Sequence, residues 1–222
     1  WFFIDPVSYQ LQTRIDTAGL NMTRQKNLSI QPIFSNYFSN KYSPGKGDFD
    51  GRLAHSVLSD PLRRKYIIQQ IADSLTHYRL QGVNVDFEEL TEKGNEPFSG
   101  FLKEIYQALH PQGFVVSVDV SPKNEDYDYH TLSVYSDFLI LMAYDQFSNS
   151  TEAGPISAQK WIEEQVDWLD KRVDLSKVIL GIAGYGRDWI REDGDKRVED
   201  LTYSQVIDLA KIAGATINFD ND

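Results

Sequence analysis

Asn84, Asp86 and Glu88 alternate with apolar residues in the stretch GVNVDFE, which spans residues 82–88. The apolar partners are valine and phenylalanine, residue types that fill buried β-strands. Because side chains alternate between the two faces of a strand, the three polar side chains share one face. Burying carboxyl groups without partners costs free energy. This face is therefore either solvated or paired in a structural network, or it holds two acids for chemistry.

The spacing of Asp86 and Glu88 fits general acid–base chemistry. Two neighbouring carboxyl groups on one strand face cannot easily both ionise, so the pKa of one of them should rise. A carboxyl with a raised pKa stays protonated near neutral pH and can donate its proton to a leaving group. From these two residues alone, a buried structural network is an equal alternative.

Strand and helix patterns alternate along the chain. Strands are predicted at residues 1–5, 28–34, 83–87, 114–120, 137–144 and 178–186. Helices are predicted from Pro61 onward, around residues 98–109 and 162–169, and at 203–213, from capping residues and apolar side chains at helical spacing. This alternation indicates βαβ units built around a parallel sheet.

The polar residues favour an α/β barrel of the TIM type, (β/α)8, over a doubly wound sheet. They gather where several predicted strands end, at Asn36, Asp86, Tyr144, Asp145 and Arg187, which is where barrel enzymes keep their sites. No glycine-rich phosphate loop follows the first predicted strand, as a dinucleotide-binding fold requires. Six strands are predicted, fewer than a closed barrel has. We therefore expect an incomplete barrel, without evident first and last strands.

Composition excludes several classes of function. The 222 residues carry a formal net charge of −11 and include no cysteine. The negative charge disfavours nucleic acid or an anionic membrane as a partner, and the missing thiols exclude a cysteine nucleophile or a thiolate metal site. The four histidines show no ligand spacing, so neither a metal nor a cofactor is expected.

The chain is expected to form a single catalytic domain over residues 1–222. It opens on the strand-like run WFFID and closes on INFDND without a terminating element. These ends predict a fragment of a longer protein with flanking domains. No signal peptide and no transmembrane run is visible in this segment.

Three motifs stand in order along the chain: GVNVDFE at residues 82–88, LMAYD at 141–145 and LGIAGYGRDW at 180–189. They resemble the signatures D-G-x-D-x-D-x-E, M-x-Y-D and L-G-I-P-x-Y-G-R-x-W of glycoside hydrolase family 18, the chitinase family. The closest resemblance is to the bacterial branch that includes spore-cortex peptidoglycan hydrolases. It implies a TIM-type barrel that acts outside the cytoplasm on polymers of β-linked N-acetylglucosamine, of chitin or peptidoglycan type.

The resemblance also implies roles for particular residues. Glu88 would be the general acid, and Asp86 would orient the N-acetyl group of the substrate, whose oxygen attacks the anomeric carbon. Tyr144 would donate a hydrogen bond to the acetyl oxygen, and Asp145 would help to position the reacting group. Residues expected to contact the glycan are Asn36, Asn84, Met142, Arg187 and Trp189. From the residues alone, Arg187 could equally belong to a structural ion pair, and Trp189 is equally a packing or a sugar-stacking residue.

The sequence departs from the family pattern at two aspartate positions. Gln81 and Asn84 stand where the first and second aspartates of the signature are expected. Asn84 can still donate a hydrogen bond to Asp86 but cannot share a negative charge with it, so the ionisation of Asp86 is open. Two alternatives to a free-standing enzyme remain. One is a non-hydrolytic glycan-binding protein on the same fold, against which the retained Glu88 argues, and the other is a catalytic module of a multidomain envelope protein.

Overall fold

The computed structural model describes residues 1–39, 47–90, 93–148, 152–192, 195–216 and 218. The chain divides into two compact units. Unit 1 comprises Trp1–Val120, Asn124–Ile140 and Arg172–Ile179, and unit 2 comprises Ser121–Lys123, Leu141–Lys171 and Leu180–Asp222. In the part of the chain that the structure describes, no helix is both long and apolar enough to cross a membrane.

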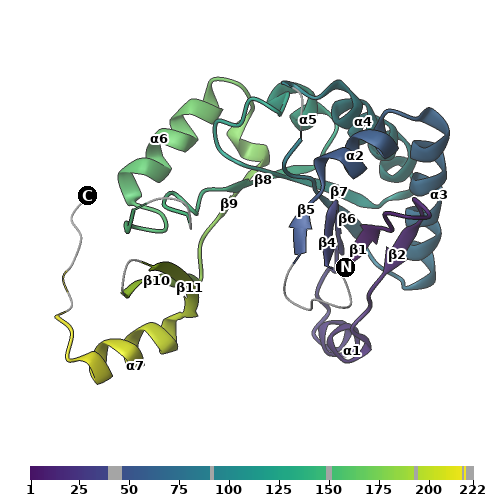
Figure 1. Cartoon of the computed structure of the whole chain (residues 1–222). Coiled ribbons are helices and arrows are strands. Elements are labelled where there is room, and N and C mark those ends of the chain that lie inside the picture. The colour runs from purple at the N-terminus through teal and green to yellow at the C-terminus, as the bar shows by residue number, and fades with distance from the viewer. Residues whose placement is uncertain (40–46, 91–92, 149–151, 193–194, 217, 219–222) are drawn as a thin grey trace. The chain divides into compact units, whose positions relative to one another are not determined.

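Strands and helices follow one another along the chain (Figure 1). The strands are β1 (Phe2–Ile4), β2 (Leu11–Thr13), β3 (Ile33–Ser35), β4 (Tyr37–Ser39), β5 (Gly47–Phe49), β6 (Gly82–Asp86), β7 (Val115–Val120), β8 (Phe138–Met142), β9 (Val178–Gly181), β10 (Tyr185–Glu192) and β11 (Asp195–Thr202). The helices are α1 (Thr17–Gln25), α2 (Gly51–Leu58), α3 (Pro61–His77), α4 (Glu96–Leu109), α5 (Tyr129–Val134), α6 (Gln159–Asp170) and α7 (Tyr203–Ala213), with 3-10 turns η1 (His110–Gln112) and η2 (Leu175–Lys177).

Apart from its edge strand β2, the main sheet follows the order of the chain. Its strands lie in the order β2-β1-β3-β6-β7-β8-β9, and β1, β3, β6 and β7 pair in parallel. Strand β2 pairs antiparallel with β1 at the edge of the sheet. A doubly wound sheet reverses its strand order at a switch point. From β1 through β9 the described strands of this sheet show no such reversal, so they have the sequential order of a βα barrel.

Strand β6 explains the alternation in GVNVDFE. Val83, Val85 and Phe87 are fully buried, and the ring of Phe87 stacks on that of Phe98 in α4, with centroids 5.7 Å apart. The polar residues therefore face the opposite side of the sheet. Gly82 lets β6 approach β7 closely, since a Cβ at this position would lie 2.1 Å from the carbonyl oxygen of Val115.

Helices α2, α3 and α4 pack against one another in unit 1 (Figure 1). The side chain of Asp60 caps α3 by accepting hydrogen bonds from the backbone of Leu62 and Arg63, and Pro61 occupies the first turn. Asn95 caps α4 in the same way through Phe98. Helix α3 begins at Pro61 as predicted, and α4, predicted around residues 98–109, begins at Glu96 and ends at Leu109.

Unit 2 contains a hairpin that the sequence analysis did not predict. Residues 178–186 are predicted as one strand, but β9 ends at Gly181 and β10 begins at Tyr185. Strand β10 pairs antiparallel with β11 over its whole length, and α7 packs against both strands. Thr202 and Gln205 form a capping box at the start of α7.

Candidate active site

The main chain of Glu88 is held by the buried side chain of Asn36. Asn36 Nδ2 donates to the carbonyl oxygen of Glu88 at 2.9 Å, and Asn36 Oδ1 accepts from the amide of Glu88 at 3.1 Å. Asn36 is only 1% exposed. Asn36 is predicted to contact the glycan, but its amide is occupied in positioning the carboxyl-bearing residue that follows β6.

Asp86 has a carboxyl oxygen that no protein group satisfies among the described residues. Its Oδ1 is buried without a hydrogen-bond partner. The pKa of Asp86 is raised to about 7, first by burial, then by the negative charges of Asp119 and Glu88. Buried polar atoms are nearly always paired in folded proteins, so a purely structural network would not leave this oxygen unpaired. An unpaired, protonatable carboxyl beside Glu88 is the pattern of a functional site.

A third carboxyl, Asp119 of β7, was not predicted as a site residue. Asn84 Nδ2 donates to Asp119 Oδ2 at 2.7 Å, and Ser117 Oγ donates to Asn84 Oδ1 at 2.7 Å. All three side chains are buried. Burial raises the pKa of Asp119 to about 6, and the hydrogen bond from Asn84 opposes that rise. The only sign in the sequence is the alternation of Ser117 and Asp119 with valines, which repeats the pattern of β6.

Substituting Asp86 with asparagine should stabilise the protein at neutral pH. The folded state holds the Asp86 proton with a pKa of about 7, against an ordinary value of 3.8, so protonation favours folding and stability falls as pH rises from about 4 to about 7. The asparagine side chain does not titrate. We expect Asp86→Asn to match the wild type near pH 4 and to exceed its free energy of unfolding by roughly 1–3 kcal/mol near pH 8. Urea unfolding at both pH values measures this, and a pH-independent difference would contradict it.

In unit 2, the carboxylate of Asp145 is paired with two neighbours. Arg187 Nη2 lies 2.7 Å from Asp145 Oδ1, and the hydroxyl of Tyr185 donates to the same oxygen. Asp145 has a φ of 60°, a left-handed conformation that is uncommon for a residue other than glycine and that clusters at functional sites. The ring of Tyr144 contacts that of Tyr185 at a centroid distance of 6.5 Å.

Arg187 has the contacts of a structural ion-pair residue. Its side chain is 7% exposed and pairs with Asp200 as well as Asp145, and its Nη1 donates to the carbonyl oxygen of Phe147 at 2.7 Å. These contacts favour the structural interpretation that the sequence left open. Met142 is buried. Trp189 is half-buried on β10, with an Nε1 that has no hydrogen-bond partner among the described residues.

Replacing Arg187 with alanine should lower the free energy of unfolding of unit 2 by about 2 kcal/mol. The change leaves a carbonyl and two carboxylates without their shared donor, although the carboxylates are partly exposed and can rehydrate. Arg197→Ala is the matched control, because Arg197 is 67% exposed in its pair with Glu199 and should contribute less than about 0.5 kcal/mol. Denaturant unfolding compares the two variants, and equal losses would show that the ion pairs of Arg187 add nothing beyond an exposed pair.

An open groove of about 590 Å³ in unit 1 includes Glu89, the residue after Glu88. Its other lining residues are Phe38, Asp48, Phe49, Asp50, Gly51 and Arg52. Glu89 has a φ of 54°, so the chain turns sharply directly after Glu88. Two aromatic side chains among charged and polar groups are suited to binding sugar rings, which present both apolar faces and hydroxyls.

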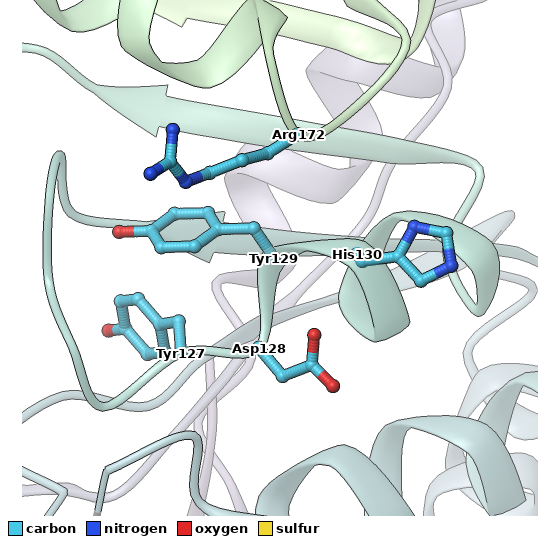
Figure 2. Close-up of a pocket in the computed structure, with 5 residues that line it drawn as sticks. All are labelled: Tyr127, Asp128, Tyr129, His130 and Arg172. Carbon is cyan, nitrogen blue, oxygen red and sulfur yellow. The ribbon is translucent and has the colours of Figure 1, made fainter.

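A different pocket of unit 1, of about 290 Å³, supports the strand that carries the acids. It is lined by Tyr127, Asp128, Tyr129, His130 and Arg172 (Figure 2). The Tyr127 hydroxyl donates to the carbonyl oxygen of Phe87, between the two acids, at 2.9 Å. Asp128 caps α5, and the Tyr129 hydroxyl accepts from the amide of Asn124 at 2.8 Å. The polar groups of Tyr127, Asp128 and Tyr129 are thus engaged within the protein, which indicates that these three residues support the structure.

Comparison with known proteins identifies the family. The model of the family described as "Glycosyl hydrolases family 18" matches residues 45–222, which include all three motifs and every predicted site residue except Asn36. The chain belongs to glycosyl hydrolases family 18. The family resemblance predicted from the motifs is confirmed.

Relatives of this family 18 chain are longer than it is. The uncharacterized glycosylase YvbX of Bacillus subtilis is 30% identical over 80% of this chain and 53% of its own length. The cortical fragment-lytic enzyme of the same organism is 22% identical over 90% of this chain and 47% of its own length. This chain therefore spans about half of the relatives that it matches.

The fold comparison agrees with the family. A crystal structure of a chitinase from Chromobacterium violaceum matches with a TM-score of 0.86 at 23% identity, covering 99% of this chain and 69% of the other. The predicted TIM-type α/β fold is thus confirmed.

Proposed function

We propose that this family 18 chain is a glycoside hydrolase that cleaves polymers of β-linked N-acetylglucosamine, of chitin or peptidoglycan type. The observation that carries the proposal is the buried, unpaired Oδ1 of Asp86, two residues before Glu88 on the same strand face. One acid can then transfer a proton while the other receives the substrate's acetamide. A single structural ion pair would provide neither function.

The first step cleaves the glycosidic bond. Glu88 donates its proton to the glycosidic oxygen, and the acetamide oxygen of the substrate attacks the anomeric carbon as the leaving sugar departs. The product of this step is a cyclic oxazolinium ion. Asp86 accepts a hydrogen bond from the acetamide N–H, which becomes more acidic as positive charge develops, so this interaction strengthens in the transition state.

In the second step, the Glu88 carboxylate takes a proton from a water molecule that attacks the anomeric carbon. The oxazolinium ring opens and the acetamide is restored, with retained configuration at the sugar. We propose that Tyr144 donates a hydrogen bond to the acetyl oxygen and that Asp145 helps to position the reacting group. Met142 and Trp189 are proposed to contact the glycan. Substitution of each in turn tests those roles.

The name of the relative described as a cortical fragment-lytic enzyme favours a peptidoglycan-type substrate. Such a substrate lies outside the cytoplasm, and we propose that this protein acts there. The groove beside Glu89 supports a polymeric substrate, because it extends the binding surface beyond the two acids.

Product analysis tests the proposed function. Purified protein is incubated with defined chitin oligomers and, separately, with purified peptidoglycan, and the products are identified by mass spectrometry. We expect new reducing ends at N-acetylglucosamine residues with at least one of the two substrates. Binding of both substrates without cleavage would instead identify a glycan-binding protein on this fold.

A further inference from the structure

Asp119 is a buried carboxyl that the motifs do not include. It is 8% exposed, and no cation pairs with it among the residues that the structure describes. Its Oδ2 accepts a hydrogen bond from Asn84. A buried carboxyl without a cation is costly to ionise, so its presence next to the candidate acids requires a reason.

The pairing of β6 with β7 places Asp119 beside Asp86. The two strands run in parallel with Asn84 opposite Ser117 and Val85 opposite Val118. One residue further along both strands, Asp86 lies opposite Asp119, on the same face of the sheet as Asn84 and Ser117. Neighbouring strands are about 4.8 Å apart. The two carboxyl groups are therefore lateral neighbours.

The orientation of Asn84 is fixed by its partners. Ser117 Oγ donates to Asn84 Oδ1 at 2.7 Å and also lies 3.2 Å from Gln31 Oε1. Asn84 must then present its NH2 group to Asp119. Because an amide donor favours the carboxylate form of its acceptor, this contact directs the negative charge of the pair toward Asp119.

We propose that Asp119 is the proton-sharing partner of Asp86 and a positioning residue for the hydrolysis. This proposal rests on the proposed function. The charge on Asp119 keeps a proton on Asp86 when the site is empty. Asn84 occupies the position at which the family signature has an aspartate, and the neighbouring strand supplies the carboxyl that Asn84 lacks.

The electrostatics of the face agree with this arrangement. The pKa of Asp86 is raised to about 7 by burial, Asp119 and Glu88, and that of Asp119 is raised to about 6 by burial. Asn84, Ser117, Gln31 and Asn36 are neutral, and among the described residues the charges that act on Asp86 are those of Asp119 and Glu88. Two coupled carboxyls titrate as a unit, and removing the charge of one lowers the pKa of the other.

Asp119→Asn tests the proposal, because it removes the charge and keeps the shape. In the proposed mechanism Asp86 must lose its proton before it can accept the acetamide N–H, so we expect the acid limb of the pH profile of kcat/KM to move about one unit toward lower pH. Ser117→Ala is the matched control: it removes the hydrogen bond to Asn84 but no charge, and should leave the limb in place. An unchanged limb in Asp119→Asn would overturn the proposal.

The double substitution Asn84→Asp with Asp119→Asn separates charge from structure. It places the carboxyl group on β6 and the amide on β7, at opposite ends of the same hydrogen bond. A negative charge therefore again lies near Asp86. We expect the acid limb to return to within about 0.3 pH units of the wild type. If the double variant has its limb at the same pH as Asp119→Asn alone, the position of the carboxyl group and not its charge determines the profile, and the proposal fails.

A titration that needs no substrate distinguishes this proposal from the proposed function. Carbon-13 NMR of the aspartate side chains should show two carboxyl groups titrating with midpoints at about pH 6 and about pH 7, as the pKa values of Asp119 and Asp86 require. In Asp119→Asn, one signal should disappear and the midpoint of the other should fall by about one unit. An unmoved midpoint would overturn the pairing, whether or not the protein cleaves a glycan.

Discussion

Replacing Glu88 with glutamine is expected to reduce glycan hydrolysis by a factor on the order of 10² or more, without unfolding the protein. Glutamine has nearly the same size but cannot transfer an acidic proton. The two hydrogen bonds between Asn36 and Glu88 involve only the main chain of Glu88, so the substitution leaves them intact. Release of reducing ends measures the activity, and circular dichroism checks the fold.

Glu96→Gln is the control for this variant. Glu96 is exposed in the first turn of α4, and its substitution makes the same chemical change away from the candidate site. Hydrolysis by Glu96→Gln should stay near the wild-type rate. Near-wild-type turnover by pure Glu88→Gln protein would show that another group supplies the proton.

The sheet was predictable from sequence because its strands are apolar and its connections are regular. Residues 114–120 and 137–144 are predicted as strands, and β7 and β8 lie within them. Their order follows from the βα alternation. The hairpin of β10 and β11 was missed because β11 reads DKRVEDLT, in which charged residues hide the apolar alternation. Helix α1 was missed because it buries none of its side chains and so has no apolar stripe.

The acids of the site were predictable only along one strand. Asp86 and Glu88 share a face by the alternation of β6, which a single sequence shows. The position of Asp119 in the site depends on the pairing of β6 with β7. Its hydrogen bond with Asn84 joins two residues that are 35 positions apart in the sequence. Asn36 similarly reaches Glu88 across 52 residues. Contacts between strands depend on register, and one sequence does not reveal register.

The acetamide of the substrate should be required at the subsite where cleavage occurs. In the proposed mechanism its oxygen is the nucleophile, and the unpaired Oδ1 of Asp86 is the acceptor for its N–H. Removing the acetyl group removes an intramolecular nucleophile, so hydrolysis should fall by a factor on the order of 10³ or more. Binding should survive, because the ammonium group of glucosamine can pair with Asp86 and the rest of the glycan keeps its contacts.

The comparison uses matched oligomers that bear either glucosamine or N-acetylglucosamine at that one subsite, with rates from reducing-end release and affinities from calorimetry. A stable thiazoline analogue of the cyclic intermediate should inhibit, since it reproduces the fused ring of the intermediate and its ring nitrogen can take up a proton and with it a positive charge. Asp86→Asn should weaken this inhibitor more than it weakens the unreacted oligomer, because the carboxylate interacts most strongly once charge has developed. Equal rates on the two oligomers would mean that the acetamide takes no part in the reaction, and a nucleophile from the protein would then have to be sought.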